Sequence, residues 1–309
     1  MTTEQPVLAH LAQETLLILE GPDASTFLHG QTTADFRNAE SRQVIAGAFC
    51  DPKGRVLCDF VALHLQSDSV LLRVHQSVIS ALEQHLEKFL LFSKATLSHS
   101  DRCVFGLCIH NLPTALKSPQ PSSQGLAVPF ESGFLVERSD HSSQTQDVEY
   151  WADKADALVF SEAVACPIQQ DSSAWYLRGI DRGEARVTAA TWGKYLPQDL
   201  NYDLLGRVNF KKGCYTGQEV IARLHWRGSP KRRLYYGIVA GNDLSVPEVL
   251  PGSKIIDNLD KARGSVVNAV RISGIDHIAF ESTTPESNSP MFIADSGACI
   301  TNIRAYFDH

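Results

Sequence analysis

Hydrophobic and polar positions along the first third of the chain follow the periods of strands and helices. The apolar run Thr15–Leu19 ends at Gly21-Pro22-Asp23, which predicts a strand and a turn, and Asp23 is placed to cap a short helix through Leu28. Apolar residues recur at helical spacing over 78–89, which predicts an amphipathic helix packed on a sheet. Further strands are expected over Val44–Cys50, Val56–Leu65, Val70–Val74 and Cys103–Ile109.

The second half of the chain passes from helical to strand-like patterns. Helical spacing is found over Ala152–Ala165 and again over Ser173–Gly183. Beyond Pro230 the apolar residues alternate in short segments separated by turn residues, which is typical of an all-β barrel or sandwich. These segments are Leu234–Val239, Gly264–Ile272, Ile275–Phe280 and Cys299–Phe307.

These patterns predict an α+β fold in two parts. Residues 1–230 form a composite α+β region, and residues 231–309 form a C-terminal all-β barrel. A loop near 111–125 is rich in Pro and Ser and a second polar loop lies near 139–147, so insertions or domain junctions are expected there. The segment Asp51-Pro52-Lys53-Gly54 is expected to be a hairpin turn.

The composition describes an acidic globular protein of 309 residues. With 35 acidic and 28 basic residues the formal charge is −7, which argues against a general polyanion binder. No apolar run reaches about 18 residues, so a membrane span is not expected. The segment Met1–Pro6 lacks the basic and apolar regions of a secretion signal, so we expect a cytoplasmic protein. The seven cysteines include no C-x-x-C pair, and most are expected to be buried.

Basic residues gather in the segment from Arg207 to Arg233. It holds eight basic residues and one acidic residue, a net charge of +7, which leaves −14 on the rest of the chain. The sequence therefore predicts a cationic surface suited to a compact anion, although a solvated face near a domain junction stays an alternative.

Cys214 lies within this segment. Lys211 and Lys212 precede it, and Gly213 and Gly217 on either side allow sharp turns that keep its sulfur accessible. Positive charge and the unpaired N–H groups of a following helix favour a thiolate. We therefore predict a reactive thiol at Cys214 with Lys212 as its supporting cation, while a buried, inert cysteine stays the alternative.

The helix after Cys214 has its own signal. Thr216 and Glu219 have the spacing of a capping box, which predicts a helix that begins at Gly217 with Glu219 in a capping role. Glu219 and Arg223 are four residues apart in the order that favours an ion pair along the helix.

The strongest resemblance to known proteins lies in this segment. Residues 212–219 read K-G-C-Y-T-G-Q-E and resemble the hallmark K-G-C-Y-x-G-Q-E of the YgfZ-type folate-binding proteins, which are relatives of the glycine-cleavage T-protein, an aminomethyltransferase. Residues 27–35 resemble that family's F-L-x-G-Q-x-T-x-D, and residues 50–55 resemble its C-D-x-K-G-R. Residues 92–94 (F-S-K) and 197–201 (P-Q-x-x-N) match in the expected order.

The resemblance implies a T-protein-like cloverleaf of three subdomains around a central hole that accepts tetrahydrofolate, with residues 1–230 supplying two intertwined subdomains of the folate-binding region. It implies a role in assembling or maintaining iron–sulfur proteins, including enzymes that thiolate tRNA. The implied partners are iron–sulfur enzymes or cluster-assembly proteins, folate and, indirectly, tRNA.

A folate needs an aromatic wall for its pterin, a carboxylate for its aminopyrimidine donors and cations for its glutamate tail. By resemblance, Trp175 takes the place of the family's folate-contacting Trp, and Asp181 takes the place of its pterin-binding Glu, with Arg182 where the family has Ala. Further candidates for folate contacts in the hallmark segment and its helix are Tyr215, Gln218 and Arg223.

Two other functions remain open on the sequence. An aminomethyl or one-carbon transferase like the T-protein would need Asp59, the acid that survives from that enzyme's G-G-x-x-D-D strand, although we expect a strand-end carboxylate there to face solvent. A tRNA-binding protein would use the +7 segment. Motifs of NTPases, dinucleotide-binding enzymes, zinc proteases and serine hydrolases are absent from the sequence, and no metal site is predicted. Whether the protein turns over a substrate stays open.

Overall fold

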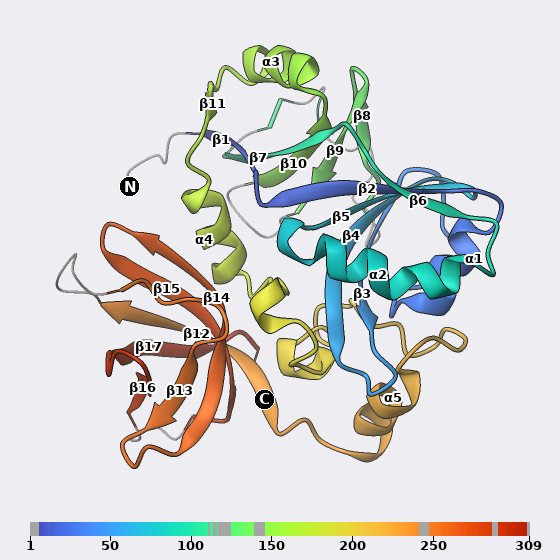
Figure 1. Cartoon of the computed structure of the whole chain (residues 1–309). Helices are drawn as coiled ribbons and strands as arrows, with labels where there is room; N and C mark the ends of the chain where they lie inside the picture. The colour runs from blue at the N-terminus through green and yellow to red at the C-terminus, as the bar shows by residue number, and fades with distance from the viewer. Residues whose placement is uncertain are drawn as a thin grey trace. The chain divides into compact units, whose positions relative to one another are not determined.

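The computed structural model describes residues 6–110, 112–113, 116, 125–138, 146–240, 247–285 and 290–307 (Figure 1). The chain forms two compact units, and each is assembled from several pieces of sequence. The first unit comprises Met1–Gly30, Ala34–Ala46 and Phe60–Trp175, and the second comprises Gln31–Thr33, Gly47–Asp59 and Tyr176–His309. Most of the two predicted loops near 111–125 and 139–147 lies outside the described residues.

A six-stranded sheet in the first unit has the order β11-β1-β7-β10-β9-β8. The antiparallel pair β7 and β10 forms its centre, where Phe105 lies opposite Tyr150. Tyr150 packs on Phe160 of helix α3 with ring centroids 4.6 Å apart, so this face of the sheet is buried under the helix. Asp153 caps α3 by accepting the N–H of Asp156. The bounds are β1 Val7–His10, β7 Cys103–Ile109, β8 Val128–Phe130, β9 Gly133–Glu137, β10 Gln146–Ala152, β11 Ile168–Gln169 and α3 Lys154–Ala163.

A five-stranded sheet has the order β3-β4-β5-β2-β6. Its long strand β4 is buried along nearly its whole length, and apart from Asp59 and His64 its buried residues are apolar. Helix α2 crosses one face of the sheet in Figure 1 and buries Ile79, Leu82 and Leu86, which share one face at helical spacing. The bounds are β2 Glu14–Glu20, β3 Gln43–Cys50, β4 Val56–Gln66, β5 Ser69–His75, β6 Thr96–His99, α1 Ala24–Gln31 and α2 Ile79–Leu90.

The C-terminal strands close into a six-stranded barrel in the order β12-β15-β14-β13-β16-β17, drawn in orange and red in Figure 1. Apolar side chains from most of its strands, Tyr235, Ile278 and Phe280 among them, fill its interior. The bounds are β12 Arg232–Ala240, β13 Lys254–Asp257, β14 Ala262–Ile272, β15 Ile275–Thr283, β16 Met291–Ile293 and β17 Cys299–Ala305. Helices α4 (Ser173–Asp181) and α5 (Gln218–Arg227) and the short 3₁₀ helices η1 (Gln76–Val78), η3 (Ala189–Thr191) and η4 (Pro197–Leu200) complete the described elements.

Two glycines bring the predicted hairpin turn against the start of α5. Gly217 has φ of 85°, and a Cβ built on it would lie 2.5 Å from the carbonyl oxygen of Asp51. Gly54 has φ of 74°, and a Cβ there would lie 3.1 Å from α5. The Asp51 carboxylate accepts the N–H groups of Lys53 and Arg55, which holds the turn in shape. The turn and the helix therefore meet backbone to backbone.

Two side chains of the P-Q-x-x-N segment brace the second unit. Buried Gln198 donates to the carbonyl of Ile221 in α5 at 2.9 Å. Asn201, in the left-handed conformation, uses its side-chain amide to donate to the carbonyl of Leu234 and to accept its N–H, so it pairs with the first barrel strand, β12, much as a neighbouring strand would. These two residues connect η4 to the helix and to the barrel.

The predicted α+β class and the C-terminal barrel are confirmed, and the first barrel strand begins at Arg232. The predicted strands of the five-stranded sheet, β7 and helices α2, α3 and α4 are also found. Several strands were missed, namely β1, β6, β10, β11, β13 and β16. All but β10 have four residues or fewer, which is too short for an alternating pattern to stand out. Strand β10 has seven residues and begins where a polar loop was expected.

Gly217→Ala is expected to lower the free energy of unfolding by about 2–4 kcal/mol, because the substitution adds left-handed strain and a clash with a backbone oxygen. Gly206→Ala is the matched control, since Gly206 has φ of 67° but no atom lies within 4 Å of a Cβ built on it. Its cost should be about 1–2 kcal/mol, the left-handed strain alone. Urea unfolding measures both, and equal losses would contradict the close contact.

Candidate functional site

The loop that carries Cys214 is tied down at both ends. At its start the Asn209 side chain accepts the N–H groups of Lys211 and Lys212, and the Asn209 N–H donates to the carbonyl of Thr33 at 2.9 Å. At its end the Thr216 hydroxyl donates to Gln31 at 3.3 Å. Residues 27–35 and 212–219, the two segments that resemble family motifs, are thus in contact through Gln31–Thr33.

Lys212 points into the protein. Its side chain is buried, and Nζ donates to the carbonyl of Thr32 at 2.7 Å and lies 4.8 Å from the ring centre of Tyr215. Tyr215 is also buried, and this burial raises the pKa of its phenol, so the ring stays neutral. The predicted supporting cation is therefore bonded to a backbone carbonyl, and the predicted folate-contacting Tyr215 lies beneath it.

Cys214 is exposed to solvent. Its thiol has no hydrogen-bond or ion-pair partner among the described residues. By contrast Cys50, Cys58 and Cys166 are buried, and burial raises the pKa of Cys50 and of Cys166. Of the seven cysteines, only Cys214 and Cys299 are exposed.

The predicted capping box does not form. Helix α5 begins at Gln218, and its N-cap is Gly217, which has no side chain to cap it. Because Gly217 enters the helix in the left-handed conformation, Thr216 lies one residue too early and bonds Gln31 instead. Glu219 is exposed, and within the described chain neither it nor the exposed Arg223 has an ion-pair partner, so their predicted pair is not formed.

The predicted cationic surface is smaller than the sequence suggested. Arg207 and Lys212 are buried, Arg232 is paired with Glu281, and Arg233 is paired with Asp203. The cations that stay exposed and have no ion-pair partner among the described residues are Lys211, Arg223, Arg227 and Lys231.

Asp59 does not face solvent, which corrects the expectation for the end of a strand. It is fully buried, with Arg186 at 2.9 Å, Arg207 at 3.5 Å and the Val187 N–H at 2.7 Å from its carboxylate oxygens. Two guanidinium groups compensate a buried charge that is otherwise costly. Asp59 therefore links β4 to the segment around residues 186–207.

The candidate folate residues Trp175 and Asp181 both lie on α4, and their surroundings differ. Trp175 is 5% exposed, and its ring lies so close to Gly106 that any side chain there would overlap it. Asp181 is half exposed and pairs with Arg304 at 3.1 Å. The Arg304 guanidinium in turn lies 4.2 Å from the ring centre of Tyr236. Asp181 thus presents a carboxylate to solvent, whereas Trp175 is largely covered. Gln218 is half-buried in the first turn of α5.

An aromatic group that the sequence analysis did not predict lies on and beside α5, where Arg223 and Arg227 are exposed. Phe210 stacks on His225 with ring centroids 3.6 Å apart, and His225 meets Trp226 edge-on at 4.6 Å. Trp226 is 68% exposed. The signal that could have found it is the aromatic pair His225-Trp226 between Arg223 and Arg227.

None of the helices in the described ranges is long and apolar enough to cross a membrane. Within the same ranges no group of three or more His, Cys, Asp and Glu side chains is arranged to hold a metal ion.

Comparisons with known proteins identify relatives. The tRNA-modifying protein YgfZ of Colwellia psychrerythraea is 32% identical over 232 residues, which cover 74% of this chain and 70% of that protein. The YgfZ of Photorhabdus laumondii is 31% identical over 266 residues, which cover 84% of this chain and 78% of that protein. No protein-family model matches the chain.

Among solved structures, the glycine cleavage system aminomethyltransferase T of Bartonella henselae has a TM-score of 0.68 and covers 97% of this chain and 85% of its own. Its sequence is 15% identical, so this likeness shows the fold alone, and the predicted T-protein-like fold is confirmed. The identity to the two YgfZ proteins, over more than two thirds of each, shows that the chain belongs to the family of the tRNA-modifying protein YgfZ.

Proposed function

We propose that this protein is a folate-binding accessory factor that acts in the cytoplasm and supports tRNA modification through the assembly or repair of iron–sulfur proteins, tRNA-thiolating enzymes among them. One observation carries the proposal: Cys214 offers an exposed thiol in a loop whose flanking residues Lys212 and Thr216 are bonded elsewhere. The similar proteins named above are called tRNA-modifying proteins, which supports a role in tRNA modification.

The proposed role of Cys214 is a transient bond to an iron atom of a client protein's cluster. When a thiol binds iron, it gives its proton to solvent and donates a sulfur lone pair. Because Cys214 is already exposed, no rearrangement is needed to uncover it. Lys212 acts as a positioning residue in this proposal, since its bond to Thr32 holds the loop.

Tetrahydrofolate is the proposed ligand, and the candidate residues fit it in part. Asp181 offers a half-exposed carboxylate that can accept the N–H donors of a pterin, and exposed Arg223 can bind the carboxylates of a glutamate tail. Gln218 supplies a further polar group near the start of α5, whereas Trp175 is only 5% exposed. A bound tetrahydrofolate supplies a reduced pterin that carries one-carbon units.

Direct RNA binding is a second candidate function, and the exposed Trp226 favours it. A base stacks on an exposed aromatic ring, and neighbouring cations attract the phosphates. Exposed Trp226 lies on α5 with Arg223 and Arg227, and neither arginine has an ion-pair partner among the described residues.

Aminomethyl transfer is not proposed. That reaction would need Asp59 as an available acid, and the Asp59 carboxylate is fully buried and held by two arginines and a backbone N–H.

Cys214→Ala is expected to abolish support of iron–sulfur enzymes in cells that lack the wild-type protein. The exposed side chain adds little to packing, so the free energy of unfolding should change by less than about 0.5 kcal/mol. Activity of a tRNA-thiolating enzyme is the readout. Cys299→Ala removes the other exposed thiol and should behave as wild type. Full complementation by Cys214→Ala would refute the role of the thiol.

Asp181→Asn is expected to weaken tetrahydrofolate binding by about tenfold or more, since a charged hydrogen-bond acceptor is lost. Titration followed by tryptophan emission measures the affinity, and Trp175→Phe identifies which ring reports it. Asp295→Asn, an exposed aspartate of the barrel, is the matched control. The absence of a saturable response in the wild type would refute the proposed binding of tetrahydrofolate.

Trp226→Ala is expected to weaken the binding of single-stranded RNA by about fivefold to a hundredfold, the range of one base stack. The dependence of affinity on salt should stay unchanged in this variant but become shallower in Arg223→Gln. Filter binding at several salt concentrations measures both. Phe92→Ala removes a ring that is 92% exposed in the first unit and should have no effect. If Trp226→Ala binds RNA with wild-type affinity, the proposed stacking of a base on Trp226 is wrong.

A further inference from the structure

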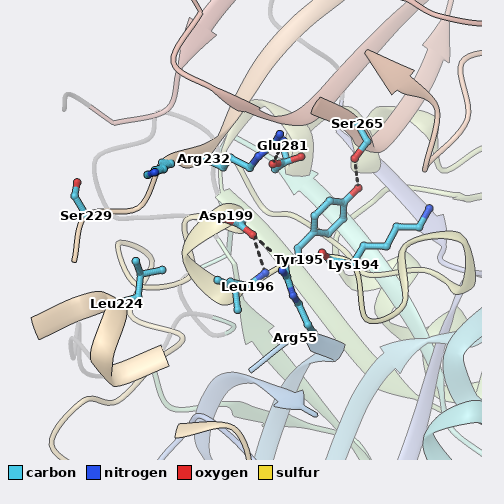
Figure 2. Close-up of a pocket in the computed structure, with 11 residues that line it drawn as sticks. Arg55, Lys194, Tyr195, Leu196, Asp199, Leu224, Ser229, Arg232, Ser265 and Glu281 are labelled. Atoms are coloured by element: carbon cyan, nitrogen blue, oxygen red, sulfur yellow. Dashed lines mark hydrogen bonds and ion pairs between the residues drawn. The ribbon is translucent and has the colours of Figure 1, made fainter. Parts of the chain in front are cut away.

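A pocket of about 510 Å³ lies in the second unit (Figure 2). Four stretches of chain line it: residue 55 after the hairpin turn, residues 194–199, the stretch 224–232 from α5 into β12, and barrel strands β14 and β15. This volume is in the range of small-molecule sites, about 300–1,000 Å³. The roles proposed for Cys214, Asp181 and Trp226 do not use this pocket.

Its charge is unbalanced. The lining residues include four cationic side chains, Arg55, Lys194, Lys231 and Arg232, against two carboxylates, Asp199 and Glu281. The pocket therefore has an excess of two positive charges within a chain of net charge −7. Such a focus of positive potential attracts anions.

The two arginines are held in place but keep most of their donors. Arg55 places Nη1 3.7 Å from Asp199 and donates from the same atom to the carbonyl of Lys194. Arg232 uses Nη1 for Glu281 and for the carbonyl of Arg263. Within the described chain the Nε and Nη2 groups of both arginines have no partner. Each guanidinium is thus pre-positioned with a free edge, the geometry that binds phosphate or carboxylate through two hydrogen bonds.

The two carboxylates can also bind a ligand. Asp199 and Glu281 are nearly buried, and this burial raises the pKa of each carboxyl. Each uses one oxygen for its arginine, and its other oxygen has no partner among the described residues. The free oxygen can accept a hydrogen bond from a hydroxyl or amino group of a ligand.

A pair of hydroxyls forms a further side of the pocket. The Tyr195 hydroxyl lies 2.8 Å from the Ser265 hydroxyl, as the dashed line in Figure 2 marks. Burial raises the pKa of Tyr195 to about 12, so its hydroxyl stays neutral. Lys231 has no ion-pair partner in the described chain, and Figure 2 shows Lys194 extending away from the arginine–carboxylate pairs.

We propose that this pocket binds a small organic dianion that also carries hydroxyl or amino groups. The free edges of Arg55 and Arg232, together with Lys231, hold the two negative charges, and the free oxygens of Asp199 and Glu281 accept from the ligand. A phosphate ester and a dicarboxylate both have this chemistry.

Isothermal titration at constant ionic strength tests the proposal with adenosine monophosphate, malate and, as a monoanion, acetate. We expect saturable binding of one or both dianions and none of acetate. Lys231→Gln removes a cation without an ion-pair partner and should weaken binding about threefold to fivefold. The double variant Arg232→Gln/Glu281→Gln removes a pair without leaving a buried charge unpaired, and it should weaken binding at least tenfold.

Lys254→Gln is the matched control, because Lys254 is exposed on the barrel and does not line the pocket. It should bind as wild type, and thermal unfolding should show that every variant is folded. Binding of adenosine monophosphate alone assigns the dianion to phosphate esters, and binding of malate alone assigns it to dicarboxylates. No saturable binding of either dianion at millimolar concentration overturns the proposal, as does unchanged affinity in both pocket variants.

Discussion

The approach of Gly217 to the carbonyl oxygen of Asp51 is the constraint on which the candidate site depends. A side chain at Gly217 would overlap that oxygen, so the hairpin turn and the start of α5 meet through backbone alone. The turn then directs Arg55 toward Asp199, and the helix carries Leu224 to the same pocket and Trp226 to the solvent. One close contact thus sets the geometry of the thiol loop, the pocket and the aromatic group of α5.

Much of the fold could be predicted because its signals are local. The buried face of α2 repeats at helical spacing, and the barrel strands alternate between turns, so the elements and the barrel followed from the pattern. The N-cap of α5 could not be predicted this way. Thr216 and Glu219 have the right spacing, but the contact with Asp51, far away in the sequence, places Gly217 at the cap instead. Tertiary contact decided between two locally acceptable starts of the helix.

The location of charge was the hardest feature to predict. Lys211 and Lys212 are neighbours in the sequence, yet one is exposed and the other is buried against Thr32 and Tyr215. Asp59 was expected at the surface and is instead the fully buried partner of Arg186 and Arg207. A net charge counts such residues equally. Only the structure separates cations that compensate buried groups from those that a ligand can reach.

The residues of the K-G-C-Y-T-G-Q-E segment divide into those that hold the fold and those that do not. Lys212 bonds Thr32, Thr216 bonds Gln31, Tyr215 fills the interior and Gly217 admits the hairpin turn. The side chain of Cys214 does not contribute to packing in this way, since it is exposed and forms no hydrogen bond with a described residue. An exposed thiol is open to oxidation, and a serine would satisfy the same backbone without that cost. Packing therefore explains the neighbours of Cys214 but not the sulfur itself, and this contrast is what motivates the chemistry proposed for the thiol.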